Sequence, residues 1–151
     1  MVNVRLIGYE NRDIADKDFR NDRVDAGEVG AGHNVTALYE VILEKGARSK
    51  QSLATLNLRY EAPGADNSAT EKSWNIHVGT LKQSPSEDLS LAYTAGTFAE
   101  ILRHSPYTAD VQMSDLNQYG KNSLNNKQGL ELIKMMDKAE DLGVGTVVSA
   151  R

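Results

Sequence analysis

The densest cluster of residues that could do chemistry is the loop running from Asp25 to His33, with the sequence DAGEVGAGH. Carboxylate oxygens and imidazole nitrogens are ligands for divalent metals, and glycine-rich loops can bind phosphate. Each of these chemistries requires a particular spacing, which the sequence can be tested against. The candidate residues of this interaction loop are Asp25, Gly27, Glu28, Gly30, Gly32 and His33.

Phosphate binding is not favoured by the glycines of this loop. Gly27, Gly30 and Gly32 follow the pattern G-x-x-G-x-G, which matches neither the dinucleotide nor the P-loop motif. In addition, the next predicted element is a strand, whereas those motifs place the anion at a helix N-terminus. We therefore expect the glycines to serve a bend in the backbone.

Metal binding is the alternative for the same loop. Asp25, Glu28 and His33 supply oxygen and nitrogen ligands, but they lack a recognised spacing such as H-E-x-x-H. The preferred interpretation is that the two carboxylates accept hydrogen bonds from backbone amides and that His33 anchors the loop. A metal-dependent ligand-binding or hydrolytic domain that uses these three residues stays open as the second hypothesis, and their convergence would favour it.

The acidic stretch before Asp25 is a candidate for a second kind of metal site, a calcium-binding loop. This stretch has neither the D-x-[DN]-x-[DN]-G spacing nor a glutamate at the twelfth position. Its acids alternate with bases, so we expect a solvated surface loop whose charges pair with one another. We expect neither a bound metal nor a cofactor. The charged residues of this stretch are Arg12, Asp13, Asp16, Lys17, Asp18, Arg20, Asp22, Arg23 and Asp25.

Catalysis by a nucleophile has little support in the sequence. There is no G-x-S-x-G elbow, there is no cysteine, and the histidines His33, His77 and His104 are far apart in the chain. His104 falls at a predicted helix C-terminus, where the helix dipole favours a cation. The sequence therefore predicts a protein that is not an enzyme, with no catalytic residue.

Composition excludes further classes of function. The chain has 151 residues, a hydrophobic fraction of 40% and a net charge of -4. An acidic chain without a basic face is not expected to bind nucleic acid. Its apolar runs are far shorter than the roughly 18 residues that a membrane-spanning helix needs, so direct membrane insertion is not expected.

The first half of the chain shows the period-two alternation of β-strands. Val2, Val4 and Leu6 predict a first strand, and a long polar connection follows it. The segments 35–43, 54–60 and 74–78 predict three more strands, of which 35–43 has the strongest pattern. We expect these three to form an antiparallel meander.

The second half changes to helical periodicity at Ser84-Pro85-Ser86-Glu87, which has the pattern of a capping box with Ser84 as N-cap. The first predicted helix buries a stripe of apolar residues and ends at His104-Ser105-Pro106. A second helix is predicted after Ser114 and a third from Asn126 to Gly143. The predicted stripe of the first helix is Leu91, Ala95, Phe98 and Leu102.

Together these patterns predict an α+β fold, with an antiparallel sheet or partial sandwich of about four to five strands followed by three helices. Residues 1–83 would form a β-rich subdomain and residues 84–151 a helical subdomain packed on it as one cooperative unit. The helical stripe would cover the apolar face of the meander. That face comprises Tyr39, Val41, Leu56, Leu58, Trp74 and Ile76.

Three segments of the sequence resemble a known family. LIGYENR (6–12), DAGEVGAGH (25–33) and VTALYEV (35–41) are similar to the C-terminal region that follows the von Willebrand factor type A domain in a family of bacterial proteins. The resemblance covers the β half well and the helical half more loosely. In that family the metal-dependent D-x-S-x-S adhesion motif belongs to the upstream domain, and this chain lacks it.

The resemblance implies a role without assigning a catalytic residue. It implies an accessory module for protein or ligand binding by a longer parent protein, whose von Willebrand factor A domain would be its partner. The parent would be exported or lipid-anchored in the bacterial cell envelope. We further expect the sheet to be incomplete, so that an open edge either pairs with upstream strands or forms a homodimer.

Overall fold

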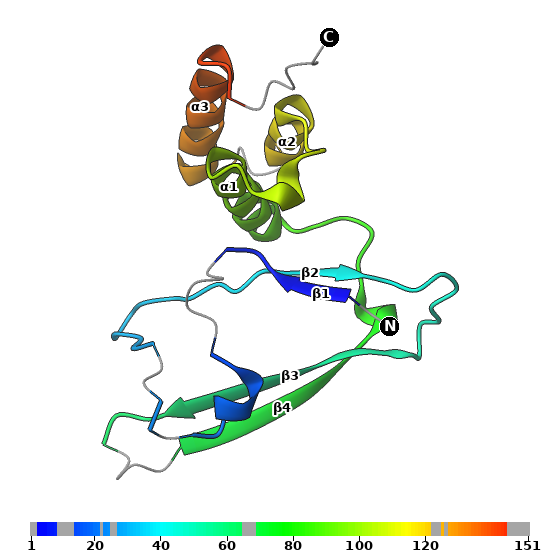
Figure 1. Cartoon of the computed structure of the whole chain (residues 1–151), viewed down its shortest axis with the longest axis vertical. Helices are drawn as coiled ribbons and strands as arrows, with labels where there is room; N and C mark the ends of the chain where they lie inside the picture. Colours follow the sequence, from blue (N-terminus) through cyan, green and yellow to red (C-terminus); the bar gives the residue numbers. More distant parts are fainter. Residues whose placement is uncertain are drawn as a thin grey trace. The chain divides into compact units, whose positions relative to one another are not determined.

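A computed structural model describes residues 3–8, 14–21, 23–24, 27–64, 69–121, 125 and 127–144 of the chain. These residues form an α+β fold with the helices in the C-terminal half, as the sequence predicts (Figure 1). The tail from residue 145 onward, like Met1, Val2 and Asn126 of the predicted elements, lies outside the described residues. The strands are β1 (Asn3–Leu6), β2 (Tyr39–Ile42), β3 (Ser52–Glu61) and β4 (Ala69–His77), and the helices are α1 (Glu87–Leu102), α2 (Met113–Gly120) and α3 (Lys127–Asp141).

The chain divides into two compact units. The first comprises Met1–Arg5, Tyr9–Val35 and Glu40–Gln83. The second comprises Leu6–Gly8, Thr36–Tyr39 and Ser84–Arg151. The packing of the helical half on the β half stays a prediction.

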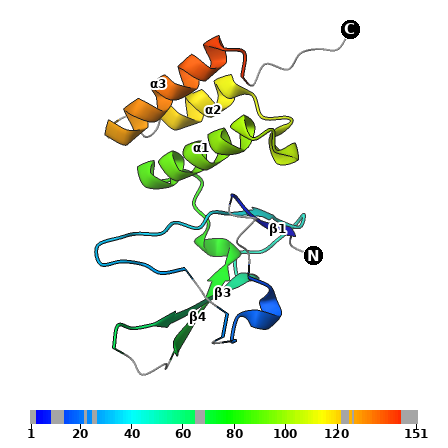
Figure 2. The same cartoon turned by 60° about the vertical axis from the view of Figure 1, so that its left-hand side comes forward.

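Strands β3 and β4 form an antiparallel ribbon in the first unit (Figures 1 and 2). In its register Leu56 lies opposite Trp74, and Ala54 lies opposite Ile76. Because side chains alternate between the faces of a strand, these four residues share one face, as the sequence predicts. The opposite face is polar, and on it Thr55 lies opposite Asn75.

Strand β2 differs from the prediction in both length and partner. It spans Tyr39–Ile42 instead of the whole segment 35–43, and it pairs with β1, so the predicted meander of the second to fourth strands is wrong. The backbone N–H of Ile7 donates to the carbonyl of Leu38 at 2.8 Å next to this pair. Val35 is 74% exposed, so among the described residues its alternating pattern has little surface to pack on. Alternation indicates an extended chain but does not choose its partner.

Helix α1 begins one residue after Ser86, which is its N-cap. The Ser86 hydroxyl accepts a hydrogen bond from the Leu89 backbone N–H at 3.2 Å, and Glu87 and Asp88 lie in the first turn. Both features satisfy or complement the free N–H groups of a helix start. The predicted N-cap at Ser84 is therefore wrong by two residues, because the serine after the proline makes the capping bond.

The core of the helical unit lies between its three helices, which Figures 1 and 2 both show packed together. Met136 is fully buried at its centre, and Val144 packs against its rim. Apolar burial of this kind stabilises a fold by roughly 25 cal/mol per Å². The core residues are Phe98, Ile101, Met113, Leu116, Leu132, Met136 and Ala139.

The buried face of α1 is rotated from the predicted stripe. Phe98 is 5% exposed, as expected, whereas Leu102 is 49% exposed and Ala95 is exposed. Small polar residues take their place, since Ser90 and Thr94 are fully buried. A period analysis of apolar residues misses such a face because it counts serine and threonine as polar.

Gly96 of α1 lies in close contact with neighbouring segments of the second unit. A Cβ atom on Gly96 would lie 3.2 Å from the Ile7 Cγ2 atom and 3.4 Å from the Leu38 Cδ1 atom. Contacts this short leave room only for a glycine unless the neighbours shift. Within the second unit, α1 thus lies directly against the segments 6–8 and 36–39.

The third helix ends as the sequence predicts. Gly143 has a φ of +84°, and its N–H donates to the carbonyl of Glu140 at 2.8 Å. The N–H of Val144 donates to the carbonyl of Ala139 at 2.9 Å. These two bonds form a Schellman motif with glycine at its left-handed position. For α2, which begins at Met113 and not after Ser114, the N-cap is Gln112, and its side chain makes no capping bond.

Helix α1 ends in the same motif but with a histidine at the left-handed position. His104 has a φ of +54°, its N–H donates to Ile101, and the Ser105 N–H donates to Glu100. A left-handed conformation costs a residue with a Cβ about 1 to 2 kcal/mol. Glycine avoids this cost. However, glycine makes the unfolded chain more flexible, and this entropy removes about 0.5 to 1 kcal/mol of the gain in stability.

We therefore expect His104→Gly to raise the free energy of unfolding by about 0.5 to 1 kcal/mol. His104→Ala keeps the Cβ atom and should give no such gain. Urea denaturation followed by circular dichroism measures both variants. A stabilisation by alanine equal to that by glycine would contradict a strained backbone at this position.

Candidate functional site

The interaction loop is exposed in its described part, residues 27–33. The His33 N–H donates to the carbonyl of Gly30 at 3.0 Å, and Gly32 has a φ of +77°. The His33 ring lies against Gly30, where a Cβ atom would be 3.0 Å from its Nδ1 atom. Gly32 therefore allows the backbone to bend, and Gly30 allows the His33 ring to lie close to the backbone.

The metal-ligand hypothesis for this loop needs three side chains. Asp25 lies outside the described residues, while Glu28 and His33 are both exposed. Within the described ranges, no group of three histidine, aspartate or glutamate residues could hold a metal ion. The interaction loop is therefore a surface feature, and the role assigned to it stays a prediction.

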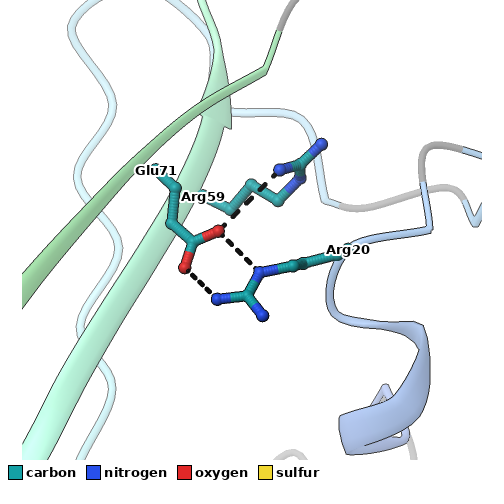
Figure 3. Close-up of polar contacts among 3 residues, drawn as sticks. All are labelled: Arg20, Arg59 and Glu71. Carbon is teal, nitrogen blue, oxygen red and sulfur yellow. Dashed lines mark hydrogen bonds and ion pairs between the residues drawn. The ribbon is translucent and has the colours of Figure 1, made fainter.

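The polar face of the β3–β4 ribbon holds a charge cluster instead (Figure 3). Glu71 of β4 accepts two hydrogen bonds from Arg20, at 2.9 Å from Nε and 2.7 Å from Nη2. Arg59 of β3, which lies opposite Glu71 in the register, approaches it to 4.0 Å. A bidentate arginine–carboxylate pair fixes both distance and orientation. The pair thus fastens the long connection after β1 to the ribbon.

This pair differs from the prediction that the acids and bases of the long connection bind one another. Arg20 instead reaches a glutamate 51 positions away. Locally, Asp18 accepts a hydrogen bond from the Asn21 side chain at 3.3 Å, and Asn21 accepts one from the Arg23 N–H. Charge alternation indicates that partners exist but does not identify them.

The pKa of Glu71 is lowered from its ordinary value of 4.5, chiefly by the hydrogen bonds from Arg20 and further by the positive charges of Arg20 and Arg59. Partial burial opposes this shift. A carboxylate with a lowered pKa in the folded state stabilises that state above its unfolded pKa. This contribution is lost as the pH falls below 4.5 and through the folded-state pKa.

We expect acid or the substitution Glu71→Gln to release Arg20 and loosen the segment 14–21 from the ribbon. Hydrogen exchange of the amides of Asp18 and Asn21, at neutral pH and near pH 3, measures this release. In the wild type, exchange should accelerate at the lower pH relative to its intrinsic rate. Glu61→Gln is the control, because it removes the same charge at the end of the same ribbon face. Equal protection in wild type and Glu71→Gln at neutral pH would refute the fastening role.

The apolar face of the same ribbon is a second candidate site. Leu56 is 46% exposed, Leu58 is 49% exposed and Trp74 is 46% exposed. Tyr60 lies on this face as well, with the Lys72 ammonium group 5.7 Å from the centre of its ring. Contiguous exposed apolar residues on a soluble protein mark interaction surfaces. We call these four residues, Leu56, Leu58, Tyr60 and Trp74, the apolar ribbon face.

This ribbon is also short of partners. Among the described residues, β3 pairs with β4 alone, so each strand has an outer edge without a neighbouring strand. A two-stranded hairpin is at best marginally stable by itself in water. The ribbon therefore combines open edges with an exposed apolar face, which makes it a candidate site.

The described residues define a small α+β module with an exposed apolar surface and a charge cluster on one ribbon. A family model described as "Uncharacterized protein YfbK, C-terminal" matches residues 1–142. The chain therefore belongs to this family of C-terminal domains. No solved structure matches the chain.

One relative is much longer than this chain. The "Uncharacterized protein YfbK" of Escherichia coli strain K12 is 28% identical over 162 aligned positions, which cover 91% of this chain. The chain spans 28% of the length of that relative.

None of the helices in the described part of the chain is both long and apolar enough to cross a membrane.

Proposed function

We propose that this chain is a non-enzymatic interaction module that adjoins a von Willebrand factor A domain in a longer protein. Two observations support the domain context. The segments 6–12, 25–33 and 35–41 resemble the region after such a domain, and the relative in Escherichia coli is much longer than this chain.

The observation that carries the proposal is the exposure of the apolar ribbon face. Leucine, tyrosine and tryptophan gather on one side of β3–β4, while the other side is polar and fastened by Arg20. The occupant we assign to this face is the part of the parent protein outside this chain. Covering it would remove apolar surface from water and complete an otherwise marginal hairpin.

The interaction loop is the second contact surface of the proposal. Glu28 and His33 are exposed on it, and the bend at Gly30 holds the imidazole in place. A surface loop positioned by a scaffold is a common place for recognition residues.

In the same proposal, the parent protein is exported or lipid-anchored in the bacterial cell envelope.

Calorimetric titration of this chain with the separately purified part of its parent protein that carries the A domain tests the proposal. We expect a stoichiometric complex with a dissociation constant in the micromolar range, about -8 kcal/mol in binding free energy. The chain alone should be a monomer in light scattering. Absence of binding, or a stable homodimer that excludes the parent protein, would overturn the proposed role of the apolar ribbon face.

A further inference from the structure

A pocket on the helical unit is independent of the surfaces described above. It is open to solvent, has a volume of about 370 Å³ and lies where α1, α2 and the segment before α2 meet. Binding pockets in proteins start at about 300 Å³. Its lining residues are Tyr93, Val111, Asp115, Leu116 and Tyr119.

Two aromatic rings form one side of this pocket. Tyr93 of α1 and Tyr119 of α2 lie edge to face, with their ring centres 5.1 Å apart and an angle of 64° between the planes. Each ring is half-buried, so the pair is held by the core while part of it faces the pocket. The face of an aromatic ring attracts cations.

A carboxylate lies beside the rings. Asp115 is exposed and precedes Tyr119 by four residues on α2, so the two side chains share one face of the helix. Asp115 forms no ion pair with any other residue of the described ranges. Val111 and Leu116 add apolar surface to the same pocket.

We infer that this pocket binds an arginine side chain of a protein partner. The carboxylate would pair with the guanidinium group, the tyrosine rings would contact its flat face, and the aliphatic stem would lie on Val111 and Leu116. Arginine fits better than lysine because a planar guanidinium can stack on a ring and donate two hydrogen bonds to one carboxylate. Nothing in this inference depends on the apolar ribbon face.

Titration of the whole chain with N-acetyl-arginine-methylamide, followed by NMR of the tyrosine rings and backbone amides, tests the inference. We expect a dissociation constant of about 1 mM, with shifts concentrated at Tyr93, Tyr119 and Asp115. The lysine analogue should bind about threefold more weakly. The uncharged citrulline analogue should bind about tenfold more weakly. Free guanidinium ions, which lack the stem, should bind more weakly than the arginine compound.

Matched variants separate this site from general attraction to an acidic protein. Asp115→Asn should weaken arginine binding about three- to fivefold and Tyr119→Leu about three- to tenfold. Asp141→Asn, which removes the same charge at the end of α3, should leave it unchanged. Equal binding of the citrulline compound, equal loss in both aspartate variants, or shifts spread over the whole chain would overturn the inference. Binding of free guanidinium as tight as that of the arginine compound would assign the pocket to a small cation instead.

Discussion

Replacing Phe98 with alanine is expected to lower the free energy of unfolding of the helical unit by about 3 to 5 kcal/mol. Phe98 is 5% exposed and belongs to the core cluster that joins the three helices. Removing its ring loses the transfer energy of the aromatic group and leaves a cavity that the neighbours fill only in part. Urea denaturation followed by circular dichroism at 222 nm measures the change.

Leu102→Ala on the same helix is the matched control. The sequence pattern places Leu102 on the same stripe as Phe98, but the structure leaves it 49% exposed. Its replacement should therefore cost no more than about 1 kcal/mol. Equal losses in the two variants would show that the predicted stripe, and not the rotated face that buries Ser90 and Thr94, is the packed one.

Replacing Leu56 with arginine is expected to weaken binding to the rest of the parent protein by about 30-fold or more. Leu56 lies opposite Trp74 on the apolar ribbon face, and both would be covered in the complex. A charged group buried there without a partner loses its hydration without compensation. The calorimetric titration proposed above measures the loss, and circular dichroism checks that the fold is retained.

Asn57→Arg provides the control for added charge. It changes the adjacent residue of β3, whose side chain lies on the opposite face of the ribbon and which pairs with Ser73. Binding should change by less than about threefold. If both variants bind as the wild type does, the apolar ribbon face is not the contact surface. If both fail equally, charge and not the covered face explains the loss.

Local features of the sequence predicted most of the secondary structure. Helix α1, its stop at His104 and the Schellman end at Gly143 all follow from capping and periodicity within a few residues. The alternation in β3 and β4 correctly placed Leu56 and Trp74 on one face. These features depend on neighbouring residues, and neighbouring residues are visible in one sequence.

The partners of strands and of charged side chains could not be predicted from neighbouring residues. The strong alternation around Val35 gave only the short strand β2, paired with β1, because pairing is decided by distant residues. The Arg20–Glu71 pair likewise joins residues far apart in sequence. The buried serine and threonine of α1 rotated its packed face, since small polar residues permit close contact between helices.

The candidate sites likewise divide into those formed by neighbouring residues, which the sequence predicts, and those formed by distant residues, which it does not. Composition and glycine spacing correctly identified the bend at Gly30 and Gly32, which a local hydrogen bond forms. The pocket between Tyr93 and Tyr119 depends on two helices meeting, so no spacing in the sequence indicated it. Leu58 and Trp74 on the apolar ribbon face are about half exposed, and the covering of this face by the chain's own helix stays a prediction.

Hydroxyl-radical footprinting of this chain alone and of its intact parent protein tests whether the apolar ribbon face is covered in the parent. Trp74 is the single tryptophan of the chain, and Tyr107, at 63% exposure in the helical unit, is an internal reference. We expect strong oxidation of Trp74 and Tyr60 in the isolated chain and marked protection of both in the parent protein, with Tyr107 oxidised equally in the two. Unchanged oxidation of Trp74 in the parent protein, or its full protection already in the isolated chain, would contradict docking through the apolar ribbon face.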